Sequence, residues 1–243
     1  MDFFGLFGKK TGASPLGKHA GRVASKRVQA VDRWESIQTL IKVGTPEAVE
    51  ALLPRFTFYV EPSITDEEEK DAAFAGIVGL GEVALAPVIL FLQKAESISW
   101  PVKMLDKLAP ADFVISKLLE LLEAMDTEYE RDPQRKIQIL ATFEERTDSR
   151  VIDAVTRFLK DANETVRFTA VGALFAQEEV ARCRQELVDC LCDEESLRIR
   201  NRILQGFCDR DWEIGARKEE VINNLPAGYY LDPKGFFRRS KSN

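Results

Sequence analysis

Apolar and polar positions alternate with helical spacing along most of this chain. The clearest segment spans residues 151–159, and a polar break at 160–164 follows it. Residues 165–174 then predict a second helix, in which Ala170 and Ala173 leave room for a close neighbour. The first of these helices carries five apolar residues on one stripe: Val151, Ile152, Val155, Phe158 and Leu159.

The same pair of helices recurs along the chain. We mark each unit by the apolar position that Leu174 defines, and these positions lie 28 to 40 residues apart: Leu40, Leu80, Leu108, Phe143, Leu174 and Phe207. Spacings of this size are typical of repeats built from helix pairs. The longest spacing predicts an insertion at 61–69. The partner helices are predicted at 46–56, 83–93, 111–124, 149–160, 180–192 and 217–225.

Several helix starts carry capping chemistry. Thr45 precedes Pro46, and Asp132 precedes Pro133, so each pair is expected to supply an N-cap and a first-turn proline. Thr65 and Glu68 have the spacing of a capping box.

The run VIDAVTRFLKDANETVRFTAVGAL at 151–174 resembles the HEAT repeat. In that family an aspartate in the turn and an arginine in the following helix bond to their neighbours along the stack. The matching residues are Asp161 and Arg167, and the next unit offers Glu194 and Arg200. The first three units lack this pair, and Pro101 stands where the third would have its arginine.

The resemblance implies an all-α fold, a right-handed α-solenoid of about six stacked HEAT-like helix pairs. We expect three parts: a basic N-terminal arm at 1–27, for which disorder stays open, the solenoid at 28–226, and an aromatic and basic tail at 227–243 that caps the stack. No run of alternating β-branched residues predicts a strand.

One segment has the length and hydropathy of a membrane span. Residues 72–92 contain a single charge, Glu82, but three glycines and Pro87 interrupt them. Two short buried helices with a tight turn near Gly81 explain the segment better.

Charge is unevenly distributed over the chain. Residues 1–27 carry a net charge of +5 and residues 232–243 carry +3, which leaves −14 on the body. An acidic body disfavours binding to a phosphate backbone. It therefore counts against one alternative, a HEAT-like DNA glycosylase using Trp212 and Asp211, and nucleic acid is not the expected partner.

Residues with catalytic or metal-binding chemistry are few. His19 is the only histidine, so no Ser–His or Cys–His arrangement is expected. The cysteines lack metal-ligand spacing and are expected as buried, reduced thiols in a cytoplasmic protein: Cys183, Cys190, Cys192 and Cys208. We read the carboxylates as a solvated surface, and expect no catalytic residue, metal or cofactor.

Both ends of the chain are aromatic and basic. Phe3, Phe4, Leu6 and Phe7 precede Lys9 and Lys10, which fits weak contact with a membrane surface, docking to a partner, or a cap. A peripheral membrane adaptor acting through residues 1–10 is therefore a second alternative.

The expected function is non-catalytic binding of a protein partner, as a scaffold, adaptor or regulatory subunit. A narrower version, by analogy within the family, is a regulator of a small bacterial Ras-like GTPase. The arginines of the last units are dense, although salt bridges with Asp189, Asp193, Glu194 and Glu195 would also explain them. Candidate partner-binding residues are Asp153, Arg157, Arg182, Gln185, Glu186, Asp189, Arg198 and Arg202.

Overall fold

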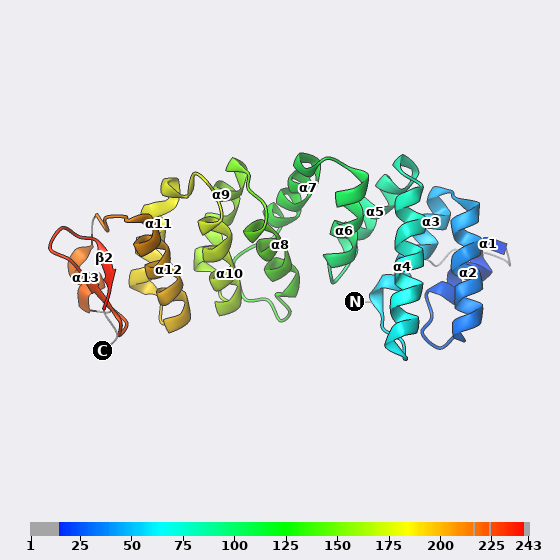
Figure 1. Ribbon diagram of the computed structural model, residues 1–243, viewed down its shortest axis with the longest axis horizontal. Helices are drawn as coiled ribbons and strands as arrows, with labels where there is room; N and C mark the ends of the chain where they lie inside the picture. Colours follow the sequence, from blue (N-terminus) through cyan, green and yellow to red (C-terminus); the bar gives the residue numbers. More distant parts are fainter. Residues whose placement is uncertain (1–14, 216, 224, 241–243) are drawn as a thin grey trace. The chain divides into compact units, whose positions relative to one another are not determined.

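The computed structural model describes residues 15–215, 217–223 and 225–240, and most of these residues lie in helices, with one small two-stranded sheet (Figure 1). The all-α prediction is confirmed. The chain divides into two compact units, residues 1–114 and 115–243. We describe each unit by itself.

The first unit consists of short helices joined by tight connections. Their bounds are α1 (Pro15–Val23), α2 (Ala30–Val43), α3 (Pro46–Leu52), the 3₁₀ helix η2 (Leu53–Thr57), α4 (Ser63–Gly79), α5 (Glu82–Lys94) and α6 (Ser99–Leu108). Helix α7 (Ala111–Glu123) begins at the end of this unit and continues into the second.

The second unit continues the helical pattern and ends in a hairpin. Its helices are α8 (Gln134–Glu144), α9 (Ser149–Val155), η3 (Thr156–Lys160), α10 (Glu164–Phe175), η4 (Val180–Cys183), α11 (Arg184–Asp193), α12 (Leu197–Arg210) and α13 (Lys218–Asn223). Strands β1 (Tyr229–Leu231) and β2 (Phe237–Arg239) pair antiparallel. The predicted partner helices agree with these bounds to within a few residues.

In the first unit α2 and α4 lie side by side, and α3 contacts both. The pair is parallel, because Arg33 of α2 contacts Glu69 of α4 and Ile41 of α2 lies over Gly76 of α4. A Cβ on Gly76 would lie 2.4 Å from a carbon of Ile41, so glycine permits this close approach.

In the second unit α10 lies between α8 and α12 (Figure 1). Phe175 of α10 lies over Gly206 of α12, where a Cβ would come within 2.3 Å of the ring. Phe143, Leu174 and Phe207 are fully buried between the layers, as their repeat position requires.

The repeat position is shifted by one helical turn in two units of the first half. Leu80 caps the end of α4 and Leu108 is the last residue of α6, and both are half-buried. Ile77 and Leu105, three residues earlier, are fully buried in their place. The marker residues chosen from the sequence were therefore wrong for these two helices.

The polar run 61–69 is not a simple insertion. Helix α4 begins at Ser63, so Thr65 and Glu68 are inside the helix and form no capping box. Thr45 does cap α3, accepting a hydrogen bond from the Ala48 N–H at 3.3 Å. Asp132 accepts one from the Gln134 N–H at 3.2 Å, although α8 starts after Pro133 rather than with it.

Part of the segment expected as a basic arm is helical. Residues 15–23 form α1, and Val23 is fully buried. His19 and Ser36 share a hydrogen bond of 3.0 Å, and Arg22 pairs with Asp32 at 3.1 Å. These contacts between α1 and α2 explain why this segment is ordered. Residues 1–14, with the apolar cluster at 3–7, lie outside the described residues.

The aromatic tail contains the two strands that the sequence did not predict. Gly235 supplies a positive φ of 91° in the turn before Phe236. Phe237 is buried against Phe207 of α12, with ring centroids 5.6 Å apart. Three-residue strands are too short to show an alternating pattern of apolar and polar residues, so no such pattern predicts them.

The apolar segment 72–92 forms the end of α4 and most of α5. Gly81, at φ 58°, makes the turn between the two helices, as predicted. None of the described helices combines the length and hydropathy that a membrane crossing requires.

Candidate functional site

Ion pairs connect successive helix pairs in the second unit. Lys136 of α8 donates to Asp161 at 3.0 Å, and Arg167 of α10 donates two bonds to Glu194 at 2.7 and 2.9 Å. Arg167 also donates to the Asp161 carbonyl at 2.9 Å. Each pair thus fixes a helix to the turn that precedes the next helix of the same layer.

These contacts account for the ionisation of Glu194. Burial raises the pKa of its carboxyl, but the hydrogen bonds from the Arg167 guanidinium and the Ser196 N–H outweigh burial, and the pKa falls below its usual value. Arg200, the matching residue of α12, has a buried Nε without a hydrogen-bond partner in the described part of the chain. Glu194 therefore pairs with Arg167 of the repeat before it, and not with Arg200.

A second charged network is buried in the first unit, where the sequence predicted a solvated surface. Arg55 of η2 donates to Glu69 at 2.6 Å and to Asp66 at 2.7 Å. Arg33 of α2 also donates to Glu69 at 2.6 Å, and Lys70 pairs with Asp66 at 2.6 Å. Four of these five side chains are almost wholly buried, Lys70 being the exception. The network ties α2, η2 and α4 together.

The eight candidate partner-binding residues fall on two sets of helices. Six of them lie on α9, η3, η4 and α11, and two lie on α12. In the first group Asp153 and Arg182 pair at 2.9 Å, while Arg157 donates to the Leu122 carbonyl at the end of α7 at 2.6 Å. Three lie on α11: Gln185, Glu186 and Asp189.

The residues on α11 are held mainly by local contacts. Gln185 donates to Asp189 at 3.1 Å, one turn along the helix. Asp189 also accepts from Arg217 at 3.1 Å, and this bond lowers the pKa of the Asp189 carboxyl. Glu186 is exposed. This group is a set of surface ion pairs between neighbouring helices, which contribute little energy individually.

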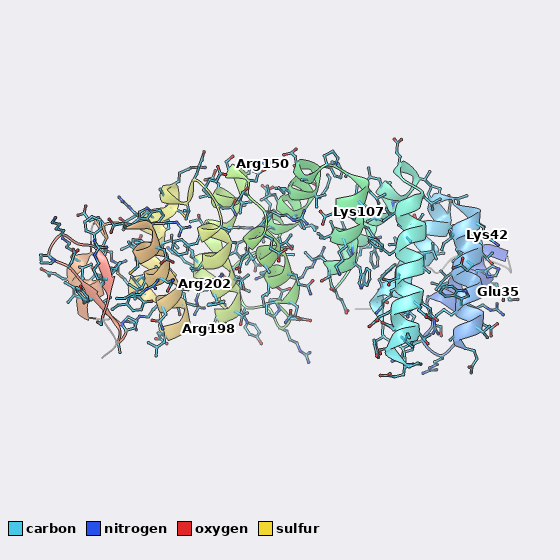
Figure 2. All side chains as sticks on the ribbon, viewed as in Figure 1. Glu35, Lys42, Lys107, Arg150, Arg198 and Arg202 are labelled. Atoms are coloured by element: carbon cyan, nitrogen blue, oxygen red, sulfur yellow. The ribbon has the colours of Figure 1, made fainter. Side chains whose placement is uncertain are left out.

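The two arginines of α12 make a more ordered arrangement with α10. The guanidinium groups of Arg198 and Arg202 both lie over the Phe168 ring, 4.4 and 4.3 Å from its centroid. Arg198 donates to Glu164 through two nitrogens, and Arg202 donates to the Phe168 carbonyl at 3.0 Å. Figure 2 labels both arginines on α12.

Arg202 reaches across α10 to α8. Its Nη2 pairs with Glu144, and the pair lies against the backbone of Gly172. A Cβ at this position would lie 2.0 Å from Nη2 of Arg202 and 2.6 Å from Cδ of Glu144. Gly172 thus makes the slot in which an ion pair joins three helices. We call Glu144, Glu164, Phe168, Arg198 and Arg202 the arginine face.

The arginine face combines fixed geometry with exposure. The Arg198 side chain is 50% exposed and that of Arg202 is 25% exposed, although both are held by carboxylates. The hydrogen bond from Arg198 lowers the pKa of Glu164, and the same bond raises the pKa of Arg198, so both groups stay charged near neutral pH. Arginines held over an aromatic ring lose little rotamer freedom when a partner binds.

Trp212 and Asp211 are committed to contacts within the chain. Trp212 packs edge-on against Phe207, with centroids 5.3 Å apart, and Arg210 lies over its ring at 5.7 Å. Asp211 pairs with Arg238 of the hairpin. These contacts explain both residues as parts of the junction between α12 and the hairpin.

The cysteines lie in packed surroundings. Cys183 and Cys190 are buried, and burial raises the pKa of the first thiol to about 11 and of the second to about 12. Cys192 and Cys208 are only half-buried, which the sequence did not predict. Among the described residues no group of three or more histidine, cysteine or carboxylate side chains could hold a metal ion.

A shallow hollow lies beside the start of α9. Its lining is Thr147, Asp148, Ser149, Gln177, Glu178 and Glu179. The Gln177 amide nitrogen donates to three backbone carbonyls, those of Phe143, Arg146 and Ala173, while its oxygen accepts from the Asp148 N–H. Gln177 therefore serves to join α10 to the turn before α9.

Sequence reasoning found Arg198 and Arg202 but missed the residues that hold them. Glu164 and Arg198 are 34 residues apart, and Phe168 and Arg202 are also 34 apart. That spacing is close to the spacing of the predicted helix pairs, so a search for partners one helix pair away could have found these residues.

Protein-family models and curated proteins both give no match to this chain.

Proposed function

We propose that this chain is a non-catalytic scaffold that binds a protein partner through the arginine face. The observation that carries the proposal is the pair of arginines over Phe168, fixed by carboxylates on two neighbouring helices and still partly exposed. Arginine and aromatic side chains are enriched at the energetic centres of protein interfaces.

The proposal includes an α-solenoid of HEAT-like helix pairs as the framework. It is supported by the repeated relation in which Lys136 reaches Asp161 and Arg167 reaches Glu194. It is also supported by α8, α10 and α12, which lie in one layer with contacts between successive members. Arrays of this kind present extended surfaces made by consecutive helices.

The packing of Trp212 favours this function over base excision, because Phe207 and Arg210 already contact its ring. The arginine face is balanced by Glu144 and Glu164, which fits a partner of mixed charge better than a phosphate backbone.

Site-specific photocrosslinking tests the proposal in cells of the native organism. A photoreactive amino acid replaces Gln205, an exposed residue of α12 one turn beyond Arg202, and in a second strain replaces Glu186 on α11. We expect a discrete protein adduct from position 205. We also expect its loss in the Arg198→Glu, Arg202→Glu double variant.

A matched control is the double variant Asp153→Ala, Arg182→Ala. It removes an exposed ion pair of similar geometry from α9 and η4, and should leave the adduct at position 205 unchanged. An adduct that survives the double charge reversal on α12, or an equal yield from position 186, would contradict binding through the arginine face.

A further inference from the structure

The first unit has an open face formed by α2 and α4. Helix α2 packs against α1 on one side, against α4 on the other and against α3 behind, which leaves one stripe uncovered. That stripe begins with Val31, Trp34 and Glu35 and continues to Gln38 and Lys42, at helical spacing. Figure 2 labels Glu35 and Lys42 on α2.

Large apolar side chains are exposed at one end of this face. Val31 is 75% exposed and Trp34 is 42% exposed. Ile64, in the first turn of α4, is 61% exposed. Since Arg33 contacts Glu69 in the parallel pair, Ile64 lies beside the start of α2, at the same end as Val31. An exposed tryptophan flanked by aliphatic residues is typical of a docking surface.

The rim of this apolar patch is acidic. Glu67, Glu68 and Asp71 on α4 are exposed, and no cation pairs with them within the described ranges. Glu35 on α2 has only a 3.6 Å contact with Arg22. The surface formed by Val31, Trp34, Ile64, Glu68 and Asp71, here called the α2–α4 patch, therefore fits a segment that combines aromatic residues with lysines.

We propose that the α2–α4 patch binds residues 3–10 of the same chain. This segment has the complementary chemistry: Phe3, Phe4, Leu6 and Phe7 for the apolar side chains, and Lys9 and Lys10 for the carboxylates. The two sets of charges are opposite in sign. The patch lies on the first unit and the arginine face lies on the second, so each proposal can fail without affecting the other.

The connection is long enough for this contact. Helix α1 runs antiparallel to α2, because His19 meets Ser36 and Arg22 meets Asp32, so α1 begins beside the C-terminal half of α2. From there, Trp34 and Val31 are about 8 to 12 Å away along the helix axis. Four residues lie between Lys10 and Pro15, and the five Cα–Cα steps that join these two residues can span about 16 Å.

Binding within one chain also favours occupancy. A connection of only four residues keeps the segment near the patch, at an effective concentration in the millimolar range. Even a weak apolar and ionic contact is then populated for much of the time.

Fluorine NMR of the full-length chain tests the proposal. The three tryptophans are labelled with 5-fluorotryptophan, and the Trp34 resonance is assigned with Trp34→Phe. We expect the Trp34 resonance to shift in the Phe3→Ser, Phe4→Ser, Phe7→Ser variant. The matched variant with leucine at these three positions keeps the apolar surface, and should leave the resonance in place.

Exchanging the charges distinguishes a direct contact from a general disturbance of the structure, because only a direct contact is restored when both sides are reversed. Lys9→Glu, Lys10→Glu and, separately, Glu68→Lys, Asp71→Lys should each move the Trp34 resonance as the serine variant does. The combination of all four changes should restore it. The control Glu178→Lys, Glu186→Lys adds the same charge on exposed positions of the second unit and should have no effect.

Three results would overturn the proposal. The first is a Trp34 resonance that is identical in the full chain and in the serine variant. The second is a shift that depends on protein concentration, because the occupant would then be a second copy. The third is a shift that appears only after anionic vesicles are added, because residues 3–10 would then bind a membrane surface and not the patch.

Discussion

The two units place their charges differently. In the first unit Arg33 and Arg55 share the carboxylates of Asp66 and Glu69 inside the fold, within one group of neighbouring helices. In the second unit the ion pairs connect successive helix pairs, as Arg167 of α10 does with Glu194 in the turn before α12. A buried network specifies one local arrangement, whereas a repeated contact can continue along an array.

The two units therefore also differ in the kind of side chain that they expose to a partner. The first unit buries Arg33 and Arg55 and exposes apolar residues such as Trp34. The second unit buries its aromatic core residues and exposes arginines held over Phe168. The comparison can be tested by removing one interaction at a time.

The largest effect is expected for Arg55→Ala in the first unit. The change leaves Asp66 and Glu69 buried with one cation fewer, and removal of one partner from a buried ion pair costs about 3–5 kcal/mol. The free energy of unfolding is measured by urea denaturation, with Trp100 fluorescence as the probe of the first unit. Lys107→Ala, at an exposed position of α6, is the control and should leave the urea midpoint unchanged. A small loss for Arg55→Ala would show that the network does not hold this unit together.

Glycine positions at close helix contacts should come next. Gly76→Ala in the first unit and Gly206→Ala in the second each push a Cβ into a packed side chain, Ile41 or Phe175, and should lower stability by about 1–3 kcal/mol. Gly172→Ala meets the flexible ends of Arg202 and Glu144, so its cost should be smaller, while the adduct at Gln205 should be lost. Equal stability losses at all three glycines would remove this distinction.

A smaller, pH-dependent effect is expected at Glu194. Its folded pKa is lowered, so its contribution is complete above the unfolded value near 4.5 and disappears as the pH falls through the folded value. Glu194→Gln should therefore lower stability by about 1–2 kcal/mol at pH 7, and the difference should vanish at low pH. Urea midpoints between pH 3 and 7 measure this. In the first unit Asp66→Asn should also lower stability at pH 7, and the difference should shrink on acidification, because the pKa of Asp66 is also lowered. A difference that grows on acidification would contradict the assignment.

The smallest effect on stability is expected at the arginine face. A double-mutant cycle on Arg198 and Glu164 should give a coupling energy below about 1 kcal/mol, because the pair is largely exposed. Crosslinking from Gln205 in the same variants should fall much more than stability does. Parallel losses of folding and crosslinking would mean that these residues only stabilise the fold.

Helix positions could be predicted because each pair keeps its apolar stripe and its polar turn. The turn near Gly81 and the cap at Thr45 followed from local chemistry. The start of α4 did not, because its acidic run looks solvated unless Arg33 and Arg55 are known to approach it. Those arginines lie 36 and 14 residues from Glu69, so no local pattern reports the contact.

The candidate site could be predicted only in part. The density of arginines on α12 pointed to Arg198 and Arg202, but it did not show that Glu144 and Glu164 hold them. Lys136 was missed because the repeat pattern favours arginine at this position, whereas an ammonium group can make the same contact with Asp161.

The reaction rates of the thiols in the second unit can report how often the surrounding helices separate. With pKa values near 11 and 12, Cys183 and Cys190 are almost wholly protonated at neutral pH and shielded from reagents. Alkylation at these sites must therefore wait for the surrounding helices to separate. The cysteines all fall within residues 183–208. Mass spectrometry of their modification rates would therefore measure local opening in this region alone, with no signal from the first unit.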